Sequence, residues 1–128
     1  MSQILILEPD RILADIYRTT LEGDGHEVLM CASAQSAIFA ADAIKPDLVI
    51  MELQLINHSG IEFLYEFRSY PEWQSTPVIV LSSVPPAEFA DSKQLLTEEL
   101  GVTDYYYKPK TSLKDLLNVT NKVLKVKA

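Results

Sequence analysis

Short apolar runs alternate with longer amphipathic stretches along the whole chain. The runs are rich in leucine, isoleucine, valine and tyrosine and are bounded by charged residues or turn residues, which is typical of strands in a buried parallel sheet. They predict five strands, at residues 3–7, 26–31, 47–52, 78–81 and 105–107. Successive strands are separated by enough residues to hold a helix, as parallel connections require.

Helix start signals follow each predicted strand. Four of these signals are polar residues that can cap a helix: Asp10, Ser33, Ser59 and Ser112. After the fourth strand, Pro85 and Pro86 predict the start of a helix that ends near Leu100, with Gly101 as its C-cap. Five βα units with right-handed crossovers predict an α/β fold, a doubly wound parallel sheet with helices on both faces, in a single domain over residues 1–128.

Composition and charge narrow the class of protein. A content of 48% apolar and 23% charged residues is that of an ordinary globular domain. The single cysteine, Cys31, excludes an internal disulfide. No apolar run approaches the roughly 20 residues that span a bilayer, and no signal peptide is visible before Glu8. We therefore expect a cytoplasmic location without membrane contact.

The charge is distributed unevenly. The net charge of −7 argues against nucleic acid as a partner, because phosphate binding needs a basic surface. Residues 1–104 hold 17 acidic and 5 basic side chains, whereas residues 105–128 hold 1 acidic and 6 basic side chains. The lysines are either a solvated helix face or a contact for an acidic segment over residues 88–99, in this chain or in a partner.

Charged residues stand at the carboxyl ends of three predicted strands. Glu8 follows the first strand, Glu52 closes the third and Lys108 follows the fifth. Because open α/β sheets bind ligands at this edge, two acids and a lysine here predict a functional site. The sequence around Ser82 has no nucleophile elbow, and no glycine-rich phosphate loop follows the first strand, which argues against a hydrolase and a nucleotide-binding domain.

Four stretches resemble the response-regulator receiver domain, the CheY-like family. They are ILILEPD (4–10), PDLVIMELQLINHSGIEFL (46–64), TPVIVLSS (76–83) and GVTDYYYKPK (101–110). The resemblance implies strand order 2-1-3-4-5 and a role in two-component or phosphorelay signal transduction. In that family an aspartate receives a phosphoryl group from a histidine kinase, with Mg²⁺ bound beside it.

The resemblance assigns a role to each matching position. Glu52 stands at the phosphoacceptor position, Ser82 at the switch hydroxyl, Tyr105 at the switch aromatic and Lys108 at the site lysine. The implied metal ligands are Glu8, Glu52 and the backbone carbonyl of Gln54. In the family the peptide bond between the residues matching Lys108 and Pro109 is usually cis.

The departures from the family pattern fall on the phosphorylation chemistry. Glu52 is one methylene longer than aspartate, and Pro9 replaces one of the two acids that hold the metal. Asp10 is adjacent, but consecutive positions at a strand end point in different directions. Ile56 replaces a common loop proline. These changes predict that the Mg²⁺ site is weak or lost and that no cofactor is bound.

We interpret the chain as a degenerate receiver, a pseudo-receiver without enzymatic turnover. Because the glutamate side chain is longer than that of aspartate, Glu52 can act as a built-in phosphomimic. In this role it pairs with Lys108 and biases Ser82 and Tyr105 toward the activated arrangement. Three alternatives stay open: an active Mg²⁺-dependent receiver phosphorylated by a histidine kinase, an engineered Asp-to-Glu variant of a working receiver, and a ligand-binding flavodoxin-like domain. Pro9 argues against the first two.

The expected partners are signalling proteins. Three successive tyrosines, residues 105–107, exceed what packing of an edge strand needs and are typical of an interface. The family uses its fourth helix, fifth strand and fifth helix for output and dimer formation, so a homodimer through this face is a hypothesis. Because the sequence ends at Ala128, output is expected to come from a binding partner.

Overall fold

The computed structural model describes residues 2–56 and 58–127 and contains one parallel sheet. The five strands are β1 (Gln3–Leu7), β2 (Glu27–Cys31), β3 (Leu48–Met51), β4 (Val78–Ser82) and β5 (Val102–Tyr107). Their order in the sheet is β2-β1-β3-β4-β5, and all neighbouring pairs are parallel. The predicted α/β class and strand order are therefore confirmed.

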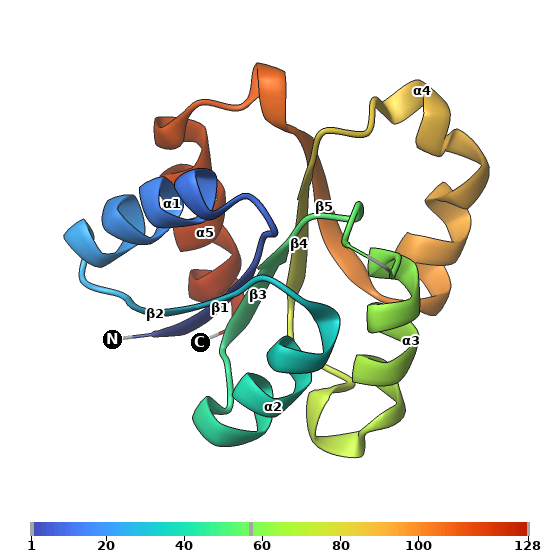
Figure 1. Ribbon diagram of the computed structural model, residues 1–128, viewed down its shortest axis with the longest axis horizontal. Coiled ribbons are helices and arrows are strands. Elements are labelled where there is room, and N and C mark those ends of the chain that lie inside the picture. The colour runs from blue at the N-terminus through green and yellow to red at the C-terminus, as the bar shows by residue number, and fades with distance from the viewer. Residues whose placement is uncertain (1, 57, 128) are drawn as a thin grey trace.

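Helices cover both faces of the sheet, as Figure 1 shows. The longer helices are α1 (Arg11–Gly23), α2 (Ala34–Ile44), α3 (Gly60–Ser69) and α5 (Leu113–Lys127). Alternate strand residues point to opposite faces, so Ile4 and Ile6 pack beneath α1 and α5, whereas Leu5 and Leu7 pack beneath α2 and α3. Every residue of β3 and β4 is buried, which makes these strands a rigid base for the side chains that follow them.

The predicted caps set the starts of the helices. Asp10 accepts hydrogen bonds from the backbone N–H groups of Ile12 and Leu13, and Ser59 forms a capping box with Glu62. Directly after Ser59, a Cβ atom added to Gly60 would lie 2.7 Å from the Cα of Leu53. Only glycine permits this close approach, which places the start of α3 against the segment that carries Glu52.

A helical segment occupies residues 86–99, as predicted, but it is not one regular α-helix. The segment after β4 is divided into α4 (Pro86–Phe89), a 3₁₀ turn (Ala90–Ser92) and a π-helical turn (Leu95–Glu99). In the π turn the N–H of Leu100 donates to the carbonyl of Leu95 at 3.0 Å, so the turn takes up one residue more than an α-helical turn. Leu96 and Leu100, which lie four residues apart, are both buried. Gly101 ends the segment with a φ of 64°, as predicted for a C-cap.

The fifth strand is longer than predicted because it begins at Val102 instead of Tyr105. Thr103 and Asp104 are polar, but they lie on an edge strand, where one side is free of neighbours. The pairing of β4 with β5 shifts by one residue between Val78 and Ile79. Among the described residues, no helix has the length and apolar character needed to cross a bilayer.

Candidate functional site

The carboxyl edge of the sheet brings the predicted site residues together. Glu8 follows β1, Glu52 follows β3, Ser82 is the last residue of β4 and Lys108 follows β5. The Nζ atom of Lys108 lies 2.5 Å from the Oε1 atom of Glu8 and 2.7 Å from the Oε1 atom of Glu52. One ammonium group is therefore shared between two buried carboxylates.

Both oxygens of Glu52 are occupied by hydrogen-bond donors. Its Oε1 atom accepts from Lys108 and from the backbone N–H of Ser83 at 3.0 Å, with the Ser83 hydroxyl at 3.2 Å. Its Oε2 atom accepts from the Ser82 hydroxyl and from the backbone N–H of Gln54 at 3.1 Å. The side chain is only 3% exposed. A buried carboxylate with this many donors is held in a single orientation.

The charge states of the pair follow from these contacts. Burial alone raises the pKa of Glu52, but hydrogen bonds from Lys108, Ser82 and two backbone N–H groups outweigh it and bring the pKa below its usual value. Burial alone lowers the pKa of Lys108, and the two carboxylates outweigh it and raise the pKa. Glu52 and Lys108 are therefore both ionised near neutral pH.

The residues present do not suit a magnesium ion. Glu8 uses one oxygen for Lys108 and accepts a 3.0 Å hydrogen bond from the N–H of Asp10 with the other. Pro9 has no side-chain oxygen, and the Asp10 carboxylate caps α1. Over residues 2–56 and 58–127, no group of three or more His, Cys, Asp or Glu side chains is placed to hold a metal. Mg²⁺ demands near-octahedral oxygen ligands, whereas both carboxylates here are paired with an ammonium group.

A chain of hydrogen bonds runs from Glu52 to the edge strand. The Ser82 hydroxyl donates to Glu52 and accepts from the N–H of Val84 at 3.1 Å. The phenol of Tyr105 on β5 donates to the carbonyl of Val84. Burial raises the pKa of Tyr105, so the phenol stays protonated and can donate. The chain of contacts connects the position of the Glu52 carboxylate with that of a partly buried aromatic ring on β5.

Sequence reasoning missed some of these contacts. Ser83 donates to Glu52 twice, and its hydroxyl also lies 3.2 Å from the side-chain oxygen of Gln54. The signal in the sequence was the second hydroxyl residue after β4, next to Ser82. The peptide bond between Lys108 and Pro109 is trans, which corrects the expectation of a cis bond. Lys108 still reaches both carboxylates from the first position of the 3₁₀ turn Lys108–Lys110.

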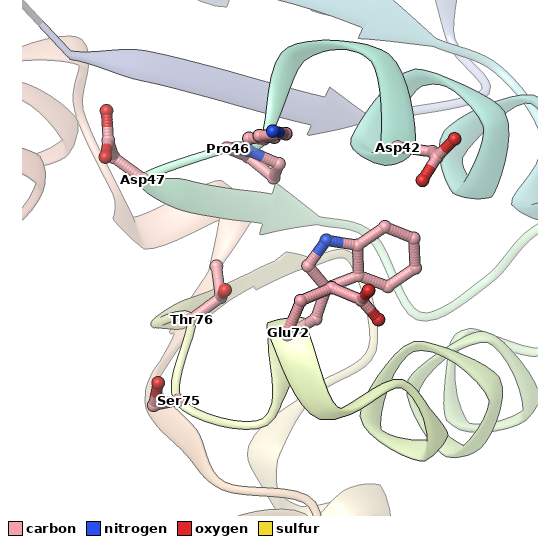
Figure 2. A pocket seen from close by; sticks show the side chains of 8 residues that line it. Asp42, Pro46, Asp47, Glu72, Ser75 and Thr76 are labelled. Carbon is pink, nitrogen blue, oxygen red and sulfur yellow. The ribbon is translucent and has the colours of Figure 1, made fainter.

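A hollow of about 410 Å³ lies at the amino edge of the sheet, opposite the edge that carries Glu52. Figure 2 shows Asp42 from α2 and Glu72 from the turn after α3 among its lining side chains. Asp47, which precedes β3, accepts a 2.8 Å hydrogen bond from the N–H of Gln3. The Trp73 ring stacks on Phe67 at a centroid distance of 4.9 Å. These contacts serve packing and strand alignment, so the hollow is a weaker candidate than the opposite edge.

Comparison with known proteins supports the resemblance to the receiver domain family. A profile of the response regulator receiver domain matches residues 4–121. The KDP operon transcriptional regulatory protein KdpE of Escherichia coli is 37% identical over 109 residues, which cover 85% of this chain and 45% of that protein. A protein-glutamate methylesterase/protein-glutamine glutaminase of Leptospira interrogans is 30% identical over 120 residues, 91% of this chain and 33% of that protein. The chain thus spans less than half the length of these relatives.

Solved structures agree on the fold. The chemotaxis response regulator CheY4 of Vibrio cholerae superposes with a TM-score of 0.83 at 22% identity, covering 96% of this chain and 98% of that one. The receiver domain of the Francisella response regulator 1452 gives a TM-score of 0.84 at 23% identity over 100% of both chains. With the family profile and the topology in agreement, the chain belongs to the response regulator receiver domain family.

Proposed function

We propose that this receiver domain signals without being phosphorylated and acts only by binding other proteins. The observation that carries the proposal is the set of donors on Glu52, the residue at the phosphoacceptor position. In the receiver family, the residues at the positions of Lys108 and Ser82 contact the phosphoryl group. Here both side chains already contact the Glu52 carboxylate. A side chain held in this way has no free oxygen with which to attack a phosphoryl donor.

Glu52 acts in this proposal as a partial, permanent mimic of the phosphorylated state. Its carboxylate extends one methylene further than that of aspartate and engages the lysine and the hydroxyl together. It supplies a single negative charge, compared with about −1.5 to −2 for a phosphorylated residue. The network through Ser82 and Val84 would then hold Tyr105 in one arrangement, independent of a kinase.

The proposal also removes the need for a metal cofactor. In a phosphorylatable site a divalent cation offsets the charge of the acids and of the phosphoryl oxygens. Here the ammonium group of Lys108 contacts both Glu8 and Glu52 and offsets one of their two negative charges. We place such a domain in the cytoplasm, without catalytic turnover.

Intact-mass measurement after incubation with acetyl phosphate and Mg²⁺ tests the proposal. We expect no change in mass for the parent chain, because Glu52 is engaged and Pro9 provides no ligand. The double variant Glu52→Asp, Pro9→Asp is expected to gain the mass of one phosphoryl group. The single variant Pro9→Asp, which keeps Glu52, is the matched control and should stay unmodified. A phosphoryl group on the parent chain would favour the alternative, an active Mg²⁺-dependent receiver.

We further propose that the segment after β4, together with β5 and α5, forms a homodimer face. Acidic residues of the broken fourth segment are exposed, and so are Lys122 and Lys125 on α5. Among the described residues these two lysines form no ion pair, so they are available to the acids of a second copy across a two-fold axis.

Light scattering tests the dimer. The double variant Lys122→Glu, Lys125→Glu is expected to shift the mass toward that of a monomer, because like charges would then face each other. Mixing it with a Glu98→Lys, Glu99→Lys variant should restore the dimer mass. An unchanged mass of the lysine double variant, or a monomeric parent chain, would remove the proposal.

A further inference from the structure

A groove of about 510 Å³ lies between α2 and α3, on the face of the sheet opposite α1 and α5. Figure 1 shows these two helices side by side. One wall is a row along α3 and its ends, because His58, Glu62, Glu66 and Tyr70 follow one another at intervals of four residues. The other wall is the outer side of α2, where Phe39 stands.

The groove is apolar at its centre. Phe63 lines it and is 1% exposed, so the floor is part of the core. Phe39 on α2 is 70% exposed, and Tyr70, directly after α3, is 38% exposed. Single exposed aromatic residues are common on protein surfaces and need no explanation. Two of them that line the same groove resemble the anchor sites of protein interfaces, where aromatic side chains contribute most of the binding energy.

The rim of the groove is acidic. Glu62 and Glu66 lie one turn apart on the same wall, and the Glu62 side chain is 68% exposed. Its described lining contains no lysine or arginine. The basic residue nearest along α3, Arg68, points inward and donates to backbone carbonyls instead of neutralising the rim. The groove therefore presents an apolar floor beside a negative wall.

The geometry points to a docking site for an amphipathic helix of another protein, with an apolar stripe flanked by lysine or arginine. Its apolar residues would cover Phe39, Phe63 and Tyr70, and its basic residues would face Glu62 and Glu66. The wall formed by α3 is ten residues long, or about 15 Å, which suits a partner helix of three to four turns. The inference rests on the proposed function in one respect only, that the domain acts by binding proteins.

A second copy of the chain does not offer such a helix. Over the part of the lysine-bearing α5 whose side chains the structure describes, a single large apolar residue is exposed, Leu113 at the first turn. The first helix, α1, exposes Ile12 and Ile16, but its Arg18 is paired with Asp15 at 2.6 Å. Arg11 is the one basic residue of α1 without an ion pair among the described residues, and a single arginine does not flank an apolar stripe along its length. The occupant is therefore a different protein.

The test begins with selection of binders from a displayed library of helix-forming peptides about 15 residues long, which cover the roughly three turns of α3 with a few residues to spare at the ends. We expect the selected peptides to share an apolar stripe flanked by basic residues. With isotope-labelled full chain, their binding should shift the backbone amide resonances of residues 34–39 and 58–70 more than those of β5 and α5. Phe39→Ala should weaken binding about tenfold or more. Glu62→Lys with Glu66→Lys should weaken it strongly at low salt and less at high salt.

Matched controls keep the test specific. Tyr65→Ala removes an aromatic residue of α3 that is 52% exposed but lies outside the groove, and Glu88→Lys reverses an acid elsewhere. Both should leave the affinity unchanged, and thermal melting should show that all variants fold. The inference fails if no peptide binds, if selected peptides lack basic residues, if shifts map to β5 and α5, or if Phe39→Ala has no effect. If the chain self-associates and Phe39→Ala abolishes this association, the occupant of the groove is a second copy of the chain and not a different protein.

This result is independent of the phosphorylation assay. A phosphoryl group on the parent chain would overturn the proposed function and leave peptide binding in the groove unaffected. Absence of peptide binding, with the parent chain unmodified by acetyl phosphate, would overturn only the groove.

Discussion

Replacing Arg68 by methionine is expected to lower the free energy of unfolding by about 2–4 kcal/mol, as measured by urea denaturation. The guanidinium group donates to four backbone carbonyls, those of Trp73, Thr76, Leu100 and Gly101, at 2.5 to 3.2 Å. Burial lowers the pKa of Arg68, and no carboxylate pairs with it in the described part of the chain. The guanidinium group thus links the end of α3 to the segments that precede β4 and β5. Methionine fills similar space but leaves these carbonyls without their donor.

Two other substitutions make the Arg68 experiment specific. Arg68→Lys keeps a charge but cannot reach four acceptors with one ammonium group, so an intermediate loss is expected. Arg18→Met removes an exposed arginine that is paired with Asp15 and should cost less than about 1 kcal/mol. A loss for Arg68→Met no larger than that for Arg18→Met would show that the four contacts do not stabilise the fold.

The fold was predictable because burial leaves a strong trace in this sequence. A strand buried on both faces must be apolar at every position, as Leu48–Met51 is, and no such run could be a surface helix. The ends of helices were predictable for a local reason. Asp10 and Ser59 bond to backbone groups only two or three residues away, so a short stretch of sequence contains both partners of the interaction.

What escaped prediction depends on contacts between distant residues. Arg68 binds the carbonyl of Leu100, 32 positions away, and a backbone acceptor has no side-chain signature. The irregular turns after β4, among them the π turn Leu95–Glu99, have no signature in the local sequence. Likewise, the early start of β5 depends on pairing with β4 and overrides the polar character of Thr103.

For the candidate site, the sequence predicted which residues meet and that Glu52 pairs with Lys108, but not the full set of hydrogen bonds. Parallel strands end at one edge, so Glu8, Glu52 and Lys108 had to be neighbours. That one lysine bridges both acids, and that Ser83 also donates to Glu52, depends on side-chain orientation. The roles taken from the resemblance stay predictions until the mass assay is done.

Replacing Lys108 by methionine is expected to destabilise the fold by about 3–5 kcal/mol at neutral pH, because two buried carboxylates lose their counter-charge. The variant should also reverse the pH dependence of stability. In the parent chain the folded pKa of Glu52 is below its unfolded value, so its stabilisation is present at neutral pH and is lost as the solution is acidified through the folded pKa. Without Lys108, we expect burial and the neighbouring Glu8 carboxylate to outweigh the remaining hydrogen bonds and to raise the pKa of Glu52, so that protonation favours the folded state. The stability of the variant should therefore rise between pH ~7 and ~5.

Urea unfolding at several pH values measures both effects, and a double-mutant cycle separates them from lost packing. Glu52→Gln removes one carboxylate while keeping its shape, so adding it to Lys108→Met should restore part of the stability at neutral pH and flatten the pH dependence. In the parent chain Glu52→Gln alone should destabilise, because Lys108 loses one of its two partners. If Glu52→Gln changed the stability by the same amount in the parent chain and in Lys108→Met, the coupling between the two charges would be zero, and the buried ion pair would contribute nothing beyond its packing. The proposed role of Glu52 as a substitute for a phosphoryl group that pairs with Lys108 would then lose its physical basis.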